Sequence, residues 1–422
     1  MAEPTGAKLI VDMTDAEVGR AERVDGVLET LKDNASMADR EATLPRANVE
    51  AISAAGLLSL VVPENLGGLG GNLRDLSAAT FAMGTACPST ALAYFFHCSA
   101  TSRGLLALEA VQAGLFDEDE SSTVEAFGSL VIDRMVSGRW MANFASESVK
   151  TSTAAISIAT SAVEVDGGWA VSGVKAFGCG TGVADDYLVT ARFPGGDTAD
   201  YLGVFIVDPT ADGVSERPPW DSLGMRGSAS HGVVLDKVFV PSNMALAVPG
   251  AFPKMMQMSR GSFVGNQPAG SACYLGSAAA VYDYAVAHLT NTKFKDTGQS
   301  IGMADFQLQV LGKMRESLDT GLLWMRRQVE LETAEPPPLT KDETVATWRI
   351  AKGTCAEAAM DVAIGALKAC GTSNTYNTGL VARSLRDISM GLVQAFPPER
   401  GRIEGARAII SGSESESFGG AK

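Results

Sequence analysis

Apolar residues recur every three to four positions along most of the first 135 residues, which predicts helices. The run RANVEAISAAGLLSLVVP predicts an apolar helix that ends at Gly56, and turn-forming residues follow at PENLGGLGGNLRD. The next run, from Asp75 to Leu108, is rich in small residues and predicts tightly packed buried helices. The acidic segment 117–122 predicts a solvated loop. We therefore expect an N-terminal α-helical domain over residues 1–138.

The period of the pattern changes near Trp140. The stretch TAAISIATSAVEVDGGWAVSGVKAFG alternates between apolar and polar residues, and Asp166-Gly167-Gly168 within it predicts a hairpin. The runs DYLVTARF, YLGVFIV and HGVVLDKVFVP continue as short strands that turn residues separate. This pattern predicts a β-sandwich or barrel domain over residues 139–247.

Helical spacing returns after Pro253 and predicts a C-terminal helical bundle over residues 248–410. The segment AEPPPLTKDE predicts a loop between two long helices. Residues 411–422 are poor in apolar side chains and predict a disordered tail. A chain of helices, then strands, then helices belongs to the α+β class. One stripe of apolar residues predicts the buried face of the first long helix: Phe306, Val310, Met314, Leu318, Leu322, Met325 and Val329.

The net charge of the chain disfavours some classes of binding partner. The sequence has 422 residues and a formal net charge of −15. A surface this acidic disfavours nucleic acid and anionic membranes as partners. Local basic side chains or helix N-termini can still bind an anionic ligand.

The six cysteines have neither the spacing of a zinc site nor that of a disulfide framework. We expect reduced, mostly buried thiols in a cytoplasmic protein. The N-terminus lacks a basic region followed by an apolar run, so no signal peptide is expected. No apolar stretch is long enough to span a membrane. The three histidines do not cluster, which disfavours a histidine-based metal site.

Five short motifs follow one another in an informative order: GLLSLVVPENLGGLGG (56–71), FASESVKTSTAA (144–155), GGWAVSGVKAFGCGTGVADDYLVTAR (167–192), LGMRGSASHGVVLDKVFVP (223–241) and RSLRD (383–387). Together they resemble the acyl-CoA dehydrogenase superfamily of flavoproteins over nearly the whole chain. The resemblance implies a four-helix bundle at the C-terminus, with FAD between the β-domain and this bundle. It also implies a homodimer or homotetramer in which a second subunit completes the FAD site.

The resemblance assigns flavin contacts to two segments of the β-domain. Ala145, Ser146 and Ser152 match the segment that lines the pyrimidine end of the flavin ring, with Ser146 in place of a threonine. Phe177 and Cys179 take the positions of an aromatic residue and a threonine beside flavin N5. A phenyl ring can stack on the flavin, whereas a thiol is a weaker donor than a hydroxyl. The alternative for Phe177 and Cys179 is packing in the core of the sheet.

The bundle departs from the resemblance at several positions. Asn291 stands where the superfamily has an arginine that reaches the FAD pyrophosphate of a neighbouring subunit. Lys293 can supply that charge instead, and Phe294 keeps the aromatic residue of the motif. Of a Gly-Gly turn that approaches FAD, Gly371 is kept. The Asp-x-x-Arg pattern that contacts acyl-CoA is not recognisable in SRGSFVGNQPAG.

Dehydrogenation of a thioester needs a carboxylate that removes the α-proton while a β-hydride passes to flavin N5. The superfamily often places this base eight residues beyond the aspartate of Arg-Asp. Here that aspartate is Asp387, so the position falls on Ala395, which cannot act as a base. Some members use an earlier helix, where this chain has Ser259. The nearest carboxylate is Glu399, which is either the base or an ordinary glutamate in the first turn of the last helix.

Three functional interpretations follow. The first is an FAD enzyme that dehydrogenates an acyl thioester of CoA or of a carrier protein, with Glu399 as base and a separate electron acceptor. The second is a flavin-dependent monooxygenase on the same fold, which takes reduced flavin from a flavin reductase and needs no such glutamate. The third is a non-catalytic relative that binds no flavin.

Overall fold

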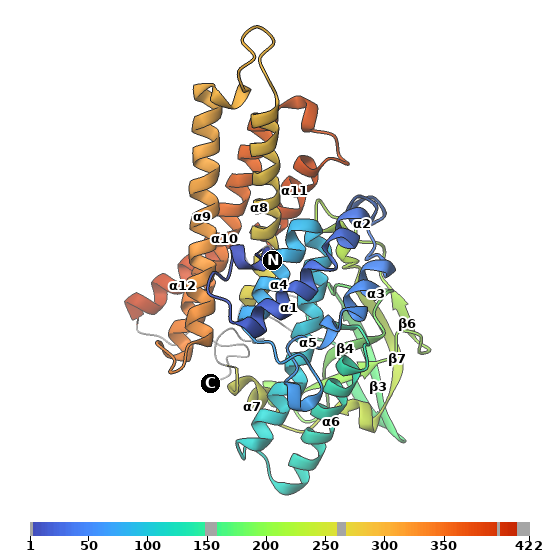
Figure 1. Ribbon diagram of the computed structural model, residues 1–422. Coiled ribbons are helices and arrows are strands. Elements are labelled where there is room, and N and C mark those ends of the chain that lie inside the picture. Colours follow the sequence, from blue (N-terminus) through green and yellow to red (C-terminus); the bar gives the residue numbers. More distant parts are fainter. Residues whose placement is uncertain (1–2, 148–157, 260–266, 395–396, 412–422) are drawn as a thin grey trace.

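The computed structural model describes residues 3–147, 158–259, 267–394 and 397–411. Helices form the N-terminal and C-terminal parts of this chain, and a β-sheet forms its middle part (Figure 1). This arrangement confirms the predicted α+β class with a helical N-terminus, a central sheet and C-terminal helices. The predicted tail, 411–422, lies outside the described residues except for Ser411.

The N-terminal helices begin at side chains that cap them. The side chains of Thr14, Asn72 and Asp117 each accept a backbone hydrogen bond from the first turn of a helix. In return, the side chain of the third helical residue accepts the backbone N–H of the cap, which completes a capping box. The predicted loop at 117–122 was therefore wrong, because Asp117 caps a helix whose first turn is acidic, as the helix dipole favours. The helices are α1 (Asp15–Asp25), α2 (Leu28–Glu41), α3 (Arg46–Ala54), α4 (Leu73–Ala86), α5 (Pro88–Gln112) and α6 (Glu118–Val136).

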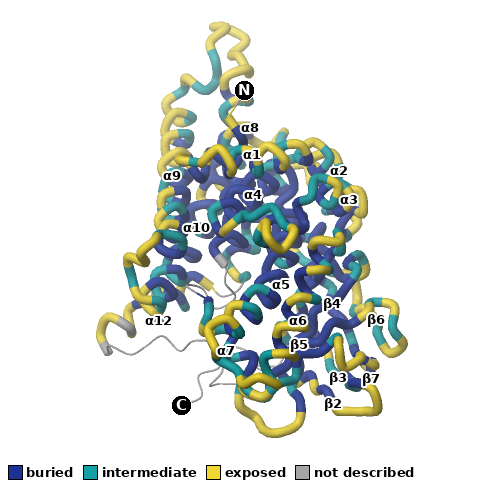
Figure 2. The backbone as a smooth tube through the Cα atoms, turned by 60° about the horizontal axis from the view of Figure 1, so that its bottom comes forward, coloured by how far each residue is buried: buried dark blue, intermediate teal, exposed yellow. Residues whose placement is uncertain are grey.

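The small-residue run of the N-terminal part forms α4 and α5, which are buried along most of their length (Figure 2). Glycines let α4 approach a helix of the C-terminal part, α8 (Gln267–Asn291), very closely. A Cβ atom on Gly276 would lie 2.0 Å from the carbonyl oxygen of Phe81, and one on Gly84 would lie 2.4 Å from that of Cys273. The N-terminal helices and the bundle therefore share one packed core.

A curled sheet of eight strands forms the middle of the chain. Strand β2 pairs with β3 across a two-residue turn at Asp166-Gly167, where Gly167 has a φ of 76°, so the predicted hairpin is confirmed. The strand order is β6-β7-β3-β2-β4-β5-β8, and β1 pairs with β4 in parallel. The strands are β1 (Met141–Phe144), β2 (Ser161–Val165), β3 (Gly168–Lys175), β4 (Asp186–Arg192), β5 (Leu202–Val207), β6 (Val214–Glu216), β7 (Val233–Pro241) and β8 (Ala245–Leu246).

In the C-terminal part, α8, α9 and α10 pack together, and α11 lies against α8 and α10. The predicted apolar stripe is buried on α9 except at Phe306, which lies in the first turn and is 60% exposed. Besides α8, the helices are α7 (Ala251–Gln257), α9 (Asp305–Thr333), α10 (Lys341–Cys370), α11 (Leu380–Ser389) and α12 (Pro398–Ser411).

The structure also bears on the predicted state of the cysteines and on membrane-spanning helices. All six cysteines are buried and carry free thiols, as predicted. In the part of the chain that the structure describes, every helix is too short or too polar to cross a bilayer.

Candidate active site

The segment that follows β1 carries two of the predicted flavin contacts. Ala145 is partly buried and Ser146 is exposed. The carbonyl oxygen of Ser146 accepts a hydrogen bond from the backbone N–H of Ala176 at 3.0 Å. This bond places the segment after β1 beside the segment after β3. Ser152, the third contact predicted here, lies outside the described residues.

Phe177 follows β3 and presents an aromatic surface to solvent. Its side chain is 49% exposed, so packing in the core of the sheet does not explain it. One part of the ring contacts Trp220, with ring centres 4.6 Å apart. The guanidinium carbon of Arg217 lies 5.3 Å from the centre of the Phe177 ring. An exposed ring beside the exposed Ser146 suits a flat aromatic ligand that has a polar edge.

Cys179 lies only two residues further on but is buried, with 6% of its surface exposed. Its sulfur is 3.1 Å from the hydroxyl of Ser230, which in turn is 2.7 Å from the hydroxyl of Ser228. Burial raises the pKa of the Cys179 thiol to about 11, so the thiol is neutral at physiological pH. Cys179 is therefore buried beside two hydroxyl groups, and its predicted contact with flavin stays a prediction.

An ion pair that the sequence analysis missed holds the segment after β1. Lys175 Nζ lies 2.6 Å from Glu147 Oε1, and both side chains are almost fully buried. Glu147 also accepts hydrogen bonds from the backbone N–H groups of Ala159 and Thr160 and from the Thr160 hydroxyl, at 2.7 to 3.0 Å. Glu147, and with it the described residues 145–147, is thus held from the buried side.

The pKa values of this pair reflect two opposed effects. Burial lowers the pKa of Lys175 to about 8, and Glu147 opposes that shift. Burial alone would raise the pKa of Glu147, but the charge of Lys175 and the hydrogen bonds hold it below its usual value. The inward position of Lys175 could be predicted from the sequence, because Lys175 shares one face of β3 with Val171 and Gly173, at steps of two residues. The partner could not be read in this way, since it lies 28 residues away in the chain.

The sheet meets the bundle at a loop that packs on α11. A Cβ atom on Gly224 would lie 2.1 Å from the carbonyl oxygen of Arg386. The next residue, Met225, donates its backbone N–H to the buried carboxyl of Asp387 at 2.6 Å. Burial raises the pKa of Asp387 to about 7, and the hydrogen bond from Met225 opposes this shift. The RSLRD motif therefore connects the bundle to the β-domain.

Glu399 is exposed in the first turn of α12. The helix start packs on α10, where a Cβ atom on Gly353 would lie 3.0 Å from Pro398 Cα. Beside this contact, the buried Lys352 donates to the carbonyl oxygen of Gly391 at 2.8 Å. Burial lowers the pKa of Lys352 to about 8, and the charge of Glu399 opposes this shift. Its predicted role as base stays a prediction, and Ala395 lies outside the described residues.

The remaining predicted flavin contacts lie far from Glu399. Lys293 and Phe294 are exposed in the connection between α8 and α9, at the tip of these two helices (Figure 1). Gly371 ends α10, eighteen residues beyond Gly353, which is about 27 Å along a helix. In a single chain, Gly371 is therefore far along α10 from the part that packs on the start of α12.

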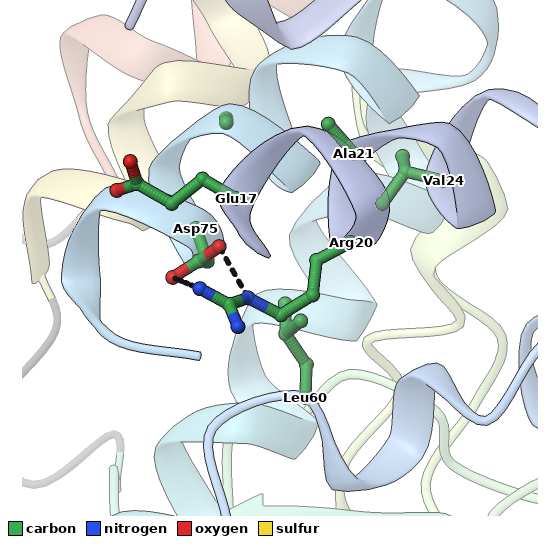
Figure 3. A pocket seen from close by; sticks show the side chains of 7 residues that line it. Glu17, Arg20, Ala21, Val24, Leu60 and Asp75 are labelled. Atoms are coloured by element: carbon green, nitrogen blue, oxygen red, sulfur yellow. Dashed lines mark hydrogen bonds and ion pairs between the residues drawn. The ribbon is translucent and has the colours of Figure 1, made fainter. Parts of the chain in front are cut away.

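A small pocket between α1 and α4 is a separate feature (Figure 3). Arg20 Nε lies 2.6 Å from Asp75 Oδ1, and the rest of the lining is largely apolar. Glu17 is held by Arg74, with Nε and Oε1 2.7 Å apart. Each of these charged side chains is already paired, so none needs a ligand. The packing of the two helices explains the pocket.

Comparison with known families agrees with the geometry of the fold. Three family models match the chain in order: acyl-CoA dehydrogenase, N-terminal domain, at residues 20–109; its middle domain at 142–238; and its C-terminal domain at 269–396. The chain belongs to the acyl-CoA dehydrogenase superfamily. The matched ranges of the superfamily models contain Phe177, Cys179 and Asp387.

Relatives within the superfamily carry different names. The putative acyl-CoA dehydrogenase YdbM of Bacillus subtilis is 26% identical over 88% of this chain and 91% of its own length. The oxygenase component of the FADH(2)-dependent resorcinol hydroxylase of Rhizobium sp. is 27% identical over 54% of this chain and 49% of its own length.

Solved structures show the same superfamily fold. KijD3, in complex with FMN and a dTDP-amino sugar, has a TM-score of 0.79 at 22% identity and covers 99% of this chain and 98% of its own. TdsC from Paenibacillus sp. A11-2, in complex with FMN and indole, has a TM-score of 0.77 at 19% identity and covers 96% of this chain and all of its own. Identities this low support the fold alone.

Proposed function

We propose that this protein is a flavin-dependent oxygenase that uses reduced flavin supplied by a partner reductase. The exposure of Glu399 carries the proposal. A carboxylate that abstracts an α-proton from a thioester needs partial desolvation, so that its pKa approaches that of its task. The sequence has alanine at the usual position of the base, and the nearest carboxylate faces solvent.

Residues at the ends of β1 and β3 would hold the flavin. The half-exposed ring of Phe177 offers a stacking surface, and the exposed Ser146 offers hydrogen-bonding groups for a polar edge. The buried pair of Glu147 and Lys175 keeps this segment in place. When bound, reduced flavin would supply the two electrons that oxygen activation requires. The relatives support either FAD or FMN, since one is named FADH(2)-dependent and two are described with FMN.

A second candidate function is dehydrogenation of an acyl thioester of CoA or a carrier protein, with FAD as hydride acceptor and Glu399 as base. Its support comes from relatives that align along nearly the whole chain. YdbM and the probable acyl-CoA dehydrogenase YngJ cover 88% and 92% of it. In this case, binding of the thioester would have to bury Glu399, and a separate electron acceptor would be needed.

The two candidates differ in their response to thioesters without oxygen and, in a second measurement, in their use of oxygen. We would load the purified protein with FAD and titrate it with a panel of acyl-CoAs while following flavin absorbance. The oxygenase proposal predicts no bleaching, and it predicts that the protein alters the rate at which reduced FMN or FADH₂ consumes oxygen. Bleaching by any acyl-CoA would contradict it in favour of dehydrogenation. A protein that binds neither flavin would contradict both and match a non-catalytic relative.

The variant Glu399→Gln tests the same distinction at a single residue. We expect oxygen consumption with reduced flavin to be unchanged, because the proposal gives Glu399 no part in it. Asp361→Asn, an exposed carboxylate on α10, is the matched control. If the wild type is bleached by a thioester and Glu399→Gln alone loses that bleaching by about 100-fold or more, Glu399 is the base of a dehydrogenase.

A further inference from the structure

Arg103 is a buried cation between α5 and α7, and 1% of its surface is exposed. Its guanidinium contacts two uncharged groups. Nη1 lies 3.3 Å from the sulfur of Met256, and the guanidinium carbon lies 5.2 Å from the centre of the Phe252 ring. An aromatic face and a thioether sulfur offset only a small part of the cost of burying a charge.

Within the part of the chain that the structure describes, Arg103 has no counter-charge. No carboxylate of the described residues forms an ion pair with it, and burial by itself lowers the pKa of Arg103 to about 10. The segments 148–157 and 260–266, outside the described residues, contain neither aspartate nor glutamate. Within the ranges that the structure does not describe, side-chain carboxylates occur at Glu414 and Glu416.

Two other buried cations of this chain show what Arg103 lacks. Lys175 has the carboxylate of Glu147 at 2.6 Å. Lys352 donates to the carbonyl oxygen of Gly391 at 2.8 Å. Buried charges in proteins are paired or hydrogen-bonded as a rule. Among the described residues, 3–147, 158–259, 267–394 and 397–411, the guanidinium of Arg103 contacts a sulfur and a ring, and this environment suits an anionic partner from outside the fold.

We propose that Arg103 is the centre of a binding site for the carboxylate or phosphoryl group of a small organic anion. A guanidinium presents parallel N–H donors that match the two oxygens of such a group. Phe252 and Met256, which contact the guanidinium, would offer apolar surface to the rest of the ligand. Lys341, whose ammonium donates to the carbonyl oxygen of Met256 at 2.8 Å, adds positive potential at the same end of α7. This site does not depend on flavin chemistry.

Thermal unfolding of the full chain tests the site without any assay of activity. Melting would be followed in sodium chloride, in inorganic phosphate and in sodium benzoate at equal ionic strength. We expect phosphate or benzoate to raise the Tm of the wild type by on the order of 2 °C over chloride, and to have no such effect on Arg103→Met. A response to phosphate alone identifies a phosphoryl ligand, and a response to benzoate alone identifies a carboxylate. Equal Tm values in all three salts, or the same response in Arg103→Met, would overturn the proposal.

Three further variants keep the test decisive. Lys254→Met removes a cation from the same helix that already has Glu120 at 3.5 Å, and it should keep the response to the anion. Arg103→Met should melt at or above the wild-type Tm in chloride, because it replaces an unpaired buried charge with an apolar side chain. Large losses of Tm in both Arg103→Met and Arg103→Lys would instead assign the arginine a structural role. The double variant that combines Glu414→Gln with Glu416→Gln tests the chain's own carboxylates. If phosphate or benzoate raises the Tm of this variant but not that of the wild type, those carboxylates occupy the site and the proposal is wrong.

Discussion

At the scale of single residues, Asp387 is the clearest case of a side chain whose chemistry depends on its burial. Its carboxyl lies at the junction of α11 and the β-domain and accepts the backbone N–H of Met225. Nearby charges act in both directions, since Asp39 raises its pKa while Arg383 and Arg386 lower it. Burial is the largest effect and raises the pKa from 3.8 to about 7.

This shift predicts a pH dependence with a definite sign. Between pH 4 and 7 the folded protein retains a proton on Asp387 that the unfolded chain has lost, so the contribution to stability falls as the pH rises through this window. Over the whole window the loss is up to about 4 kcal/mol. Asp387→Asn keeps an acceptor for Met225 and cannot ionise, so its Tm relative to wild type should rise from pH 4.5 to pH 8. Asp361→Asn is the control, and a constant Tm difference for Asp387→Asn would contradict the argument.

At the scale of elements, the approach of α4 and α8 depends on glycine. The carbonyl oxygen of Phe81 occupies the space that a Cβ atom of Gly276 would need. Backbone atoms cannot move aside as the end of a flexible side chain can. The contact joins the N-terminal helices to the bundle, and both helices are buried there (Figure 2).

A pair of glycine substitutions tests this contact. Gly276→Ala should destabilise the protein by about 1 to 3 kcal/mol, because it overpacks a core that has no room. Gly312→Ala, on the exposed face of α9 with no atom within 4 Å of its added Cβ, should stabilise the protein by about 0.5 to 1 kcal/mol. Both values would be measured by urea unfolding. Equal effects of the two substitutions would mean that helix propensity, and not the approach of α4 and α8, decides the outcome.

At the scale of the whole molecule, the predicted flavin contacts fall into two groups. Ser146 and Phe177 follow β1 and β3, whereas Lys293 and Phe294 lie in the connection between α8 and α9 (Figure 1) and Gly371 ends α10. The resemblance assigns the position of Lys293 to the flavin of a neighbouring subunit, and it places Gly371 in a turn that approaches FAD. Their separation within one chain is compatible with a site that two chains share in a symmetric assembly.

Complementation between two variants tests whether the site is shared. Phe177→Ala and Lys293→Ala should each weaken flavin binding by about tenfold or more, with little change in Tm because both side chains are at least partly exposed. When the two variants are co-expressed, random pairing in a dimer should restore wild-type affinity at about a quarter of the sites. Titration of the mixture with flavin measures that fraction. Phe239→Ala, an equally exposed phenylalanine on β7, is the control. Absence of the high-affinity fraction would place each site within one chain.

Much of the fold was predictable because its signals are local. The change of period near Trp140 separates helices from strands, and the turn at Asp166-Gly167 sets a hairpin register. The stripe on α9 was correct except for Phe306, which is exposed in the first turn of the helix. The acidic run at Asp117 was misjudged, because a charged segment can be a helix N-terminus as well as a loop.

The candidate site was only partly predictable. Phe177 and Cys179 have the spacing of side chains on one face of a strand, yet one is exposed and the other buried. The reason is that β3 ends at Lys175, so strand alternation no longer applies to them. The burial of Lys352 could be read from its spacing of four from Trp348 on α10, but its partner, the carbonyl oxygen of Gly391, could not.

The sequence by itself determined the class of each segment, the order of the elements and the superfamily, because these depend on periodicity and on short motifs read in order. The tertiary structure decided which charges are paired, which ring faces solvent and which carboxylate is buried. Those properties depend on contacts between residues far apart in the chain, such as Glu147 with Lys175 and Met225 with Asp387. A local pattern can say that a side chain points inward, but only the packed molecule decides whether a charged partner lies beside it. Among the described residues, Arg103 has none.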